Sequence, residues 1–438
     1  MDLLVKFKRI YFNKESLSDA DMSMSRNVSI FEGCTARSIL TLTSGAFLVG
    51  FAKYLGASNE KSGIIAAIPV LAGMVTVFSP IVLERLESRK LITVMLCFIG
   101  RLMMGLMVLI PFVSSSPTVR IQLLIWVFFT ANIILSCTVP YALAWILNIT
   151  PERIRGAYFG KRESTVLGAV TVVTLLMGQV LDKFEQLGHQ FTGFVVLYIF
   201  VIAASLVNMV LFSHIKEPTN PVSNSRVSLK NLFTIPFKNK NFMKITLLTV
   251  LWNFGYQLAF PFTSVYMVSI LNLRYGLVTV MAVLASVTSV VSVRFWGRIA
   301  DKKSWLYIMK LMIILQILSF LIWFFINPNT VYILLPVAHI LGGAAISGVN
   351  ISVNNLQYSF SPDENKTVYM GFASAVNGML GFLGTLVGSF FIKATENRGV
   401  FWGEFSVGNM QMLFFIAGVV LTVSILSILR FRLSSADM

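Results

Sequence analysis

Charged residues are scarce in this chain of 438 residues: Asp, Glu, Lys and Arg make up 12% of it, and hydrophobic residues make up 56%. An ordinary soluble protein has about 25% charged residues. A soluble globule of this length needs a charged surface, so the composition excludes one. The mean hydropathy of +0.78 indicates a protein that crosses a membrane several times.

Cysteine and histidine are also rare, with three residues of each. Cys34, Cys97 and Cys137 lie in apolar runs without metal-ligand spacing, which argues against a disulfide framework and against a metal site. The chain contains no HExxH, GxSxG or GxxxxGK[ST] motif and no polar domain to hold one. We therefore expect neither an enzyme nor an ATP-driven pump, and no cofactor or bound metal.

Apolar runs of about 20 residues are long enough to cross a bilayer as helices. Such runs predict an all-α polytopic membrane protein with twelve transmembrane helices. They lie near residues 30–54, 63–83, 91–113, 121–147, 164–182, 191–213, 245–270, 275–295, 305–326, 331–358, 368–392 and 408–429.

The formal net charge of +16 raises the question of nucleic-acid binding. With both termini in the cytoplasm, 25 of the 35 Lys and Arg residues fall in inner segments and seven in outer ones. This asymmetry is the positive-inside rule, which orients helices during insertion. The excess of basic residues therefore reflects the orientation of the helices in the membrane, and we expect no nucleic-acid partner. Residues 1–28 lack a cleavable signal and are either an interfacial helix or a disordered tail.

Two loop pairs indicate an internal duplication. An acid followed by a base occurs at Glu84-Arg85 and again at Asp301-Lys302, 217 positions later. Thr150-Pro151-Glu152 with Tyr158 and Gly160 matches Ser361-Pro362-Asp363 with Tyr369 and Gly371 at a constant offset of 211. The chain is therefore predicted to form two pseudo-symmetric six-helix halves.

Three charged side chains lie deep in predicted spans. Glu32 and Arg37 occur in the first span, about 140° apart around a helix, so each needs a partner on another helix, in water or in a substrate. Glu32 is expected near the interface, within reach of water. Arg101 lies about 15 Å into the third span, where an arginine must face protein or water. A structural pair with a neighbouring carboxylate or carbonyl is the favoured reading of Arg101.

Polar residues also concentrate in the fourth, seventh and tenth spans, whose polar faces should look inward because unpaired polar groups are costly in hydrocarbon. His339, in the tenth span, is either a packing residue or a proton relay. The candidates for hydrogen bonding to a substrate are Asn132 and Tyr141, then Asn253, Tyr256 and Gln257, then Asn350 and Asn354.

This architecture, with a central cytoplasmic linker and charged turns after the second and eighth spans, resembles the major facilitator superfamily of secondary transporters. The family signature in these turns is Gly-x-Leu-Ala-Asp-Arg-x-Gly-Arg-Lys. Gly297, Ala300, Asp301 and Lys302 match it in the polar turn 297–304, with Ser304 at the position of the second Gly. The first copy departs further, with Pro80 for the first Gly, Glu84 for Asp and Glu87 for the second Gly.

The resemblance implies that spans 1, 4, 7 and 10 line a central cavity and that spans 2, 5, 8 and 11 form the moving interface. Glu84, Arg85, Gly297, Asp301 and Lys302 would gate the cytoplasmic side. The predicted parts are a leader (1–28), two halves (29–214 and 245–430), a cytoplasmic linker (215–244) and a tail (431–438).

The function predicted is secondary active transport of a small organic solute across the cytoplasmic (plasma) membrane by alternating access. The deeper parts of the predicted spans contain one acidic residue, Glu32, and two basic residues, Arg37 and Arg101. This excess of positive charge favours an anionic or zwitterionic substrate, with Arg37 as its main contact. Glu32 and His339 are the candidates for coupling. The expected partners are this substrate, the lipid bilayer and a coupling proton or ion, and we expect a monomer. The alternatives are a multidrug exporter of the same fold, or a non-transporting receptor, assembly factor or scramblase on a carrier scaffold.

Overall fold

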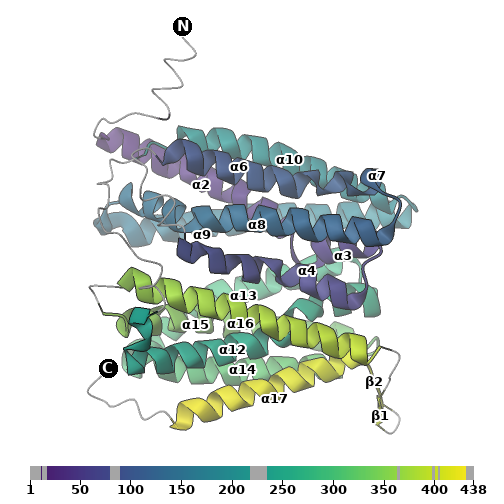
Figure 1. Ribbon diagram of the computed structural model, residues 1–438. Helices are drawn as coiled ribbons and strands as arrows, with labels where there is room; N and C mark the ends of the chain where they lie inside the picture. The colour runs from purple at the N-terminus through teal and green to yellow at the C-terminus, as the bar shows by residue number, and fades with distance from the viewer. Residues whose placement is uncertain are drawn as a thin grey trace. The chain divides into compact units, whose positions relative to one another are not determined.

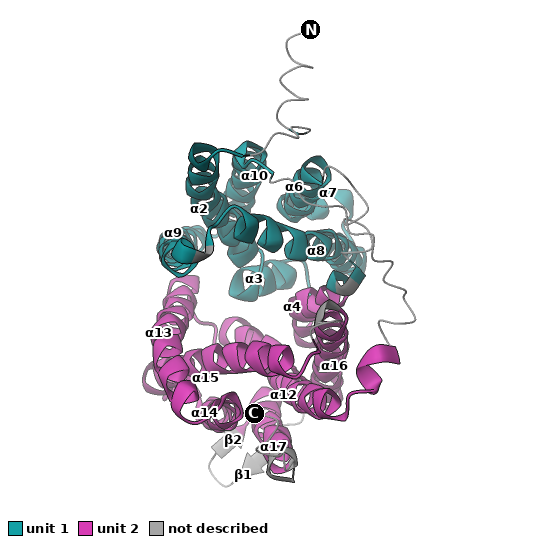
Figure 2. Cartoon of the chain, turned by 90° about the vertical axis from the view of Figure 1, so that its left-hand side faces the viewer, with its two compact units in different colours: residues 1–57, 75–226 teal, residues 58–74, 227–438 magenta. Residues whose placement is uncertain are grey.

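The structure is a computed structural model that describes residues 11, 17–78, 89–217, 234–362, 366–396, 400–402 and 405–430 (Figure 1). Its elements are almost all helices, as the composition predicts. By packing, the chain divides into two compact units (Figure 2). Unit 1 comprises residues 1–57 and 75–226, and unit 2 comprises residues 58–74 and 227–438. Residues 58–74, which precede most of unit 1 in the sequence, thus pack with unit 2.

Unit 1 is a bundle of long helices in which α2 packs against α9 and α10, and α6 packs against α8 and α10. Its elements are α2 (Asp19–Leu42), α3 (Gly45–Tyr54), α6 (Lys90–Leu106), a 3-10 turn η2 (Met107–Leu109), α7 (Ile110–Val113), α8 (Pro117–Asn148), α9 (Glu152–Gln186) and α10 (Gln190–His214). A 3-10 segment, η1 (Gly73–Phe78), spans the division between the units.

In unit 2, α14 and α13 pack against α15, and α16 packs against both α12 and α4. A hairpin of two three-residue strands joins α16 to α17. The elements are α4 (Asn59–Ala72), α12 (Lys240–Val265), the short π-helix η3 (Tyr266–Ile270), α13 (Tyr275–Lys302), α14 (Trp305–Phe325), α15 (Val331–Ser359), α16 (Lys366–Ala394), β1 (Val400–Trp402), β2 (Phe405–Val407) and α17 (Asn409–Arg430).

Nine helices among the described residues are long and apolar enough to cross a membrane, or ten if the bent pair α2 and α3 is one span. The predicted spans 63–83 and 245–270 correspond to α4 and α12, which are not among these ten. An all-α membrane fold is therefore confirmed, while the number twelve stays a prediction.

The first predicted span, 30–54, is not one straight helix. The structure has α2 and α3 separated at Thr43 and Ser44 and bent by 42°. Helix α2 also begins earlier than predicted, at Asp19, within the segment assigned to the leader. Ser18 and Asp21 form a capping box there, which satisfies the first free N–H groups of the helix.

The polar turn predicted at 297–304 is mostly helix. Helix α13 continues to Lys302, and Ser304 begins the next helix by accepting a hydrogen bond from the N–H of Tyr307 (3.2 Å). The prediction was wrong because charged residues at a helix end were taken as a helix break. Glu84, Arg85 and the rest of the matching segment 79–88 lie outside the described residues.

The duplication is visible in matching contacts within the two units. In unit 1 the Tyr158 hydroxyl donates to the carbonyl of Arg26 (3.1 Å), and the Arg26 guanidinium donates to the carbonyl of Ile149 (2.8 Å). In unit 2 Tyr369 donates to the carbonyl of Ile235 (3.4 Å) and Asn239 to that of Phe360 (3.3 Å). Ile149 and Phe360, like Tyr158 and Tyr369, are 211 positions apart.

Glycines set the close approach of α16 to its neighbours. A Cβ on Gly384 or Gly388 would collide with the backbone carbonyls of Phe254 and Leu258 in α12, and one on Gly378 would approach Met74 and the carbonyl of Val70. The glycines of α16 therefore allow close packing between helices.

Candidate functional site

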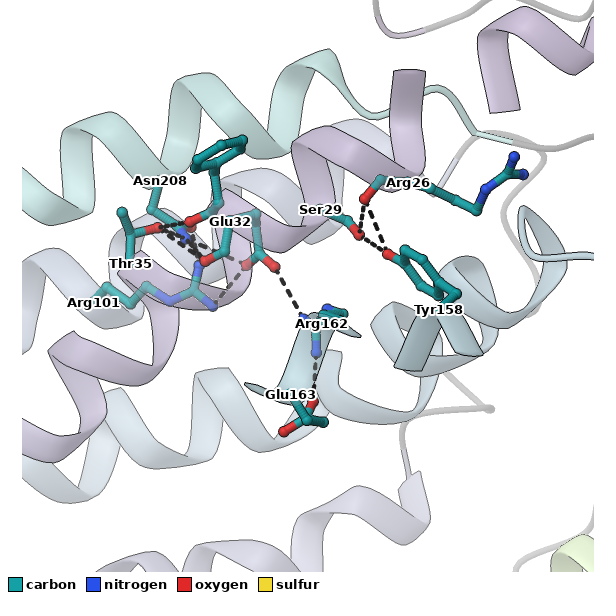
Figure 3. Close-up of polar contacts among 10 residues, drawn as sticks. Arg26, Ser29, Glu32, Thr35, Arg101, Tyr158, Arg162, Glu163 and Asn208 are labelled. Carbon is teal, nitrogen blue, oxygen red and sulfur yellow. Dashed lines mark hydrogen bonds and ion pairs between the residues drawn. The ribbon is translucent and has the colours of Figure 1, made fainter. Parts of the chain in front are cut away.

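Charged and polar side chains meet inside unit 1 in a group that we call the Glu32 cluster, made of Glu32, Thr35, Arg101, Arg162 and Asn208 (Figure 3). Glu32 Oε1 lies 3.5 Å from Arg101 Nη2 of α6, and Oε2 lies 3.7 Å from Arg162 Nη2 of α9. Glu32 is only 6% exposed. The prediction that water reaches Glu32 was wrong, because α6, α9 and α10 cover this part of α2.

Asn208 of α10 completes the Glu32 cluster. Its amide oxygen accepts a hydrogen bond from Arg101, and its Nδ2 donates to the Glu32 carbonyl (3.0 Å) and to Thr35 Oγ1 (2.7 Å). One asparagine thus connects α10 to both α2 and α6. Each of these side chains has at least one polar partner, which offsets part of the cost of removing it from water.

Arg162 reaches Glu32 by crossing over Gly33. A Cβ at this position would lie 2.8 Å from Arg162 Nη2, so only glycine leaves the guanidinium its place. The other side of the guanidinium contacts Glu163 (2.9 Å), whose side chain is 66% exposed. About one turn from Gly33 towards the start of α2, Ser29 bonds to the Tyr158 hydroxyl, which also fixes α9 to α2 (Figure 3).

The Glu32 cluster carries one acid against two buried bases. The Nε atoms of Arg101 and Arg162 are buried and have no hydrogen-bond partner in the described part of the chain. Removing the Glu32 carboxylate would leave Arg101 without a counter-charge and Arg162 with only the exposed Glu163, which is costly in a low-dielectric interior.

Arg37, the main predicted substrate contact, differs from the two paired arginines. It lies about halfway between Asp19 and Tyr54, and its side chain is exposed. Among the described residues it has no ion pair. An arginine at this depth in a membrane helix needs water, protein or a ligand around it.

The candidates in α8 are both buried. Asn132 donates to the Phe128 carbonyl of its own helix (2.8 Å). Tyr141 lies in an apolar cluster with Trp145 and Phe212, and its hydroxyl bonds to the Glu217 carboxylate. The same carboxylate accepts hydrogen bonds from two backbone N–H groups at the start of α6, those of Arg89 (3.1 Å) and Lys90 (3.2 Å). Through Glu217, Tyr141 therefore links α8 to the start of α6 at one end of the bundle.

Unit 2 has a polar group without charge, the Thr249 cluster, made of Thr249, Asn253, Gln357 and Asn377. Thr249 Oγ1 accepts from Asn377 Nδ2 (3.1 Å) and from Gln357 Nε2 (3.4 Å). Asn253 donates to the Asn377 carbonyl (2.6 Å). These contacts join α12, α15 and α16 through amides and hydroxyls alone.

The other candidates of unit 2 divide into buried and exposed residues. Tyr256 is 8% exposed and stacks between Trp252 (5.4 Å) and Phe260 (4.6 Å). Gln257 is also buried. Asn350 and Asn354, one helical turn apart on α15, are both exposed.

The remaining candidates are His339, in α15, and the residues Gly297, Asp301 and Lys302 near the end of α13. His339 Nδ1 lies 2.9 Å from the Leu335 carbonyl of its own helix, and its ring packs on Trp323 (5.5 Å between centroids). Asp301 and Lys302 are exposed and have no ion pair with a described residue, and Gly297 leaves open space where a Cβ would point.

Comparison with known proteins identifies the family. The family model described as Major Facilitator Superfamily matches residues 33–385. The chain belongs to the Major Facilitator Superfamily. No curated protein matches the sequence.

Solved structures of similar fold are also transporters. A mutant of the nucleoside transporter NupG is similar with a TM-score of 0.70 and 14% identity, over 93% of this chain and 99% of that one. A POT family transporter in complex with a thioalcohol-conjugated peptide gives 0.67 and 14%, over 93% and 95%. A bacterial homologue of the human lysosomal transporter Spinster, inward-facing and unoccupied, gives 0.61 and 13%, over 94% and 97%. At these identities the likeness shows the fold alone.

This member of the superfamily is an integral membrane protein and a transporter, not an enzyme. Sequence reasoning missed several residues of its polar contacts, among them Arg162, Asn208 and Glu217. Arg162 was counted only as an inner base, and Asn208 is a single polar residue in an apolar span. For Arg162 and Asn208 the available signal was Glu32 itself, because a buried carboxylate requires cationic and amide partners on neighbouring helices, but this signal does not say which residues they are.

Proposed function

We propose that this transporter is a secondary active carrier that moves a small organic anion or zwitterion across the cytoplasmic membrane by alternating access. The superfamily and its transporter neighbours support a carrier. The absence of a nucleotide-binding motif from the sequence supports energy from a gradient rather than from ATP.

Arg37 carries the substrate part of the proposal. Arg101 and Arg162 have Glu32 as their counter-charge, whereas Arg37 has no described ion pair and is exposed. A planar guanidinium binds carboxylate and phosphate groups through two parallel hydrogen bonds. Arg37 is thus the cation of unit 1 that we expect to bind the anionic group of a substrate.

Neutral polar side chains are proposed to contact the rest of the substrate. Asn350 and Asn354 are exposed, so their amides are open to a ligand. Asn132, Tyr141, Asn253, Tyr256 and Gln257 are buried or partly buried, and they would first have to give up packing or hydrogen bonds within their own unit. We therefore rank Asn350 and Asn354 above these five.

Coupling and gating remain proposals on the residues named from the sequence. Glu32 is placed to couple a change in its ion pairs to movement of α9 against α2, and His339 is the alternative proton carrier. For the cytoplasmic gate we keep Glu84, Arg85, Gly297, Asp301 and Lys302. The exposed Asp301 and Lys302 are available to pair when a partner approaches.

The experiment is thermal unfolding of the purified protein in detergent against a panel of carboxylates, phosphates, amino acids, sugars and apolar drugs. A ligand at 100 times its Kd stabilises the folded state by about 2.7 kcal/mol. We expect carboxylates or phosphates to stabilise the wild type and Arg37→Lys partly, and not Arg37→Ala. Arg153→Ala is the matched control, because Arg153 is also exposed but lies near the start of α9.

Uptake of the stabilising compound into proteoliposomes then tests transport itself. Counterflow that disappears in Arg37→Ala and persists in Arg153→Ala supports the carrier. Stabilisation only by apolar drugs, unaffected by Arg37→Ala, would favour a multidrug exporter. Tight binding without any flux would favour a receptor or another non-transporting role.

A further inference from the structure

Arg162 of α9 lies between a buried carboxylate and an exposed one (Figure 3). Its Nη2 is 3.7 Å from Glu32 Oε2, and the Glu32 side chain is 7% exposed. Its Nη1 donates to Glu163 Oε1 at 2.9 Å, and the Glu163 side chain is 66% exposed. The guanidinium of Arg162 therefore lies at the boundary between the Glu32 cluster and the exposed surface of α9.

The contact between Arg162 and Glu163 is the easier of the two to break. Adjacent residues project about 100° apart around a helix and do not face each other, so the two side chains must bend to meet. An ion pair with an exposed partner gains little, because water competes for both groups. The contact with Glu32 is buried, and there the loss of one partner is costly. An incoming anion would therefore replace Glu163 and not Glu32.

Arg37 lies one turn along α2 from the place where Arg162 crosses it. That place is Gly33, where a Cβ would lie 2.8 Å from Arg162 Nη2. Residues four apart are neighbours on one face of a helix, with about 5–6 Å between their Cβ atoms. Helical side chains also extend back towards the N-terminus, so we expect the long side chain of Arg37 to extend towards Gly33. The guanidinium groups of Arg37 and Arg162 are thus brought to the same side of α2.

We propose that Arg37 and Arg162 together bind the anionic group of the substrate, and that the Glu163 carboxylate occupies Arg162 until the substrate displaces it. With Glu163 displaced, Arg37 and the Glu32 cluster hold three guanidinium groups and one carboxylate, and therefore a net charge of +2. A group with two negative charges neutralises this excess. The substrate class is then a small organic dianion, a phosphate monoester or a dicarboxylate. This inference rests on the carrier function proposed above and adds a second arginine, a competing acid and the charge of the substrate.

The test compares the binding of small anions to the purified full-length protein in detergent. The unfolding midpoint, measured against anion concentration at constant ionic strength, gives each Kd. The dianions are succinate and inorganic phosphate above its second pKa, and the monoanion is acetate. We expect the wild type to bind a dianion at least about tenfold more tightly than acetate, and Arg37→Gln to lose this preference. Glu163→Gln should bind the dianion about two- to fivefold more tightly than the wild type, because it removes the competing carboxylate.

Glu185→Gln is the matched control. Glu185 is also an exposed acid of α9, but it lies near the other end of the helix, and its replacement changes the net charge of the protein by the same amount. Its Kd for the dianion should equal that of the wild type. Tight binding of succinate alone identifies the substrate as a dicarboxylate, and tight binding of phosphate alone identifies it as a phosphate ester.

Coupling between two substitutions separates a binding role of Arg162 from a structural one. In Arg162→Gln, which leaves Glu32 its other arginine, adding Glu163→Gln should no longer tighten binding, because the competition is for Arg162 itself. If Arg162→Gln does not fold, the single variants of Arg37 and Glu163 still decide. Equal Kd values for Glu163→Gln and the wild type, or no preference for dianions, overturn the inference. Anion binding that still depends on Arg37 then leaves the carrier proposal standing, whereas the absence of any binding that depends on Arg37 contradicts both.

Discussion

In unit 1 the helices α2, α6, α9 and α10 meet at one carboxylate, two arginines and an asparagine, whereas in unit 2 the helices α12, α15 and α16 meet at amides, a hydroxyl and glycines. The two units share contacts at one end, where Tyr158 and Tyr369 serve the same purpose. They differ in the middle. At the offset of 211 that relates these tyrosines, the position of Arg162 is occupied by the fully buried Ala373.

The difference shows how one fold can be stabilised in two ways. Charge pairs give unit 1 specific contacts that a ligand or a proton can compete for. Close backbone packing gives unit 2 contacts that no small ion can replace, because Gly384 and Gly388 bring α16 against carbonyls of α12. We therefore expect the changes associated with coupling to begin in unit 1. Four experiments test this contrast.

The largest effect is expected for Glu32→Ala. It leaves the buried Arg101 without a counter-charge and Arg162 with only the exposed Glu163, and we expect the folded state to lose about 3–5 kcal/mol. Unfolding in detergent, followed by heat or by denaturant, measures the loss. Glu163→Ala is the matched control: it removes the exposed partner of the same arginine and should cost under about 1 kcal/mol. Equal effects of the two variants would contradict a buried role for Glu32, and Glu32→Gln keeps the test possible if Glu32→Ala does not fold.

The next largest effect is expected in unit 2, for Gly384→Ala. The added Cβ would meet the Phe254 carbonyl, which cannot move without shifting α12, so we expect a loss of about 1–3 kcal/mol. Gly297→Ala is the control, since it adds the same atom in open space within α13 and should be neutral or stabilising by up to about 1 kcal/mol. Amide hydrogen exchange should show the loss of protection in α12 and α16. If Gly384→Ala is as stable as the wild type, unit 2 is not held by close packing.

A direct comparison of the units comes from two asparagines. Asn208→Ala removes a hydrogen bond to a charged guanidinium and should cost about 1.5–3 kcal/mol, whereas Asn377→Ala removes neutral hydrogen bonds and should cost about 0.5–1.5 kcal/mol. Hydrogen exchange of each unit, measured in both variants, should place each loss in its own unit. A larger effect for Asn377→Ala would reverse the contrast.

The smallest effect is expected for Asp21→Asn. Asp21 pairs with Lys216 across the end of unit 1 at 2.7 Å, but both side chains are substantially exposed. We expect a change of about 0.2–1 kcal/mol that disappears in high salt, because exposed pairs are screened. A large loss that persists in salt would mean that charge stabilises unit 1 at its surface as well as in its interior.

Much of the fold followed from the sequence. Apolar runs, the asymmetry of basic residues and the repeat at an offset of 211 together predicted an all-α membrane protein, and the turn motif predicted the superfamily. The exact ends of the helices could not be predicted from the sequence. The charged sequence at Asp301 and Lys302 suggested a turn, because a single sequence does not show that α13 continues past the apolar run.

The candidate site followed only in part. A charged residue in a span can be found by its cost in a membrane, which is how Glu32, Arg37 and Arg101 were selected. Its partners depend on which helices lie beside it and on their rotation. Asn208 and Arg162 could not be paired with Glu32 from the sequence, since they lie in other helices far along the chain. The burial of Glu32 could not be predicted for the same reason, because it depends on which helices pack beside α2.

The Glu32 cluster also sets an order of assembly during synthesis. Glu32 leaves the ribosome long before its partners: Arg101 follows 69 residues later and Asn208 follows 176 residues later. Until then the first span carries an uncompensated acid and base, and an early helix of this kind is poorly retained in lipid. We therefore expect α2 to remain near the insertion machinery until α6, α9 and α10 have been made. The six-helix half, and not the single helix, would then be the unit released into the membrane.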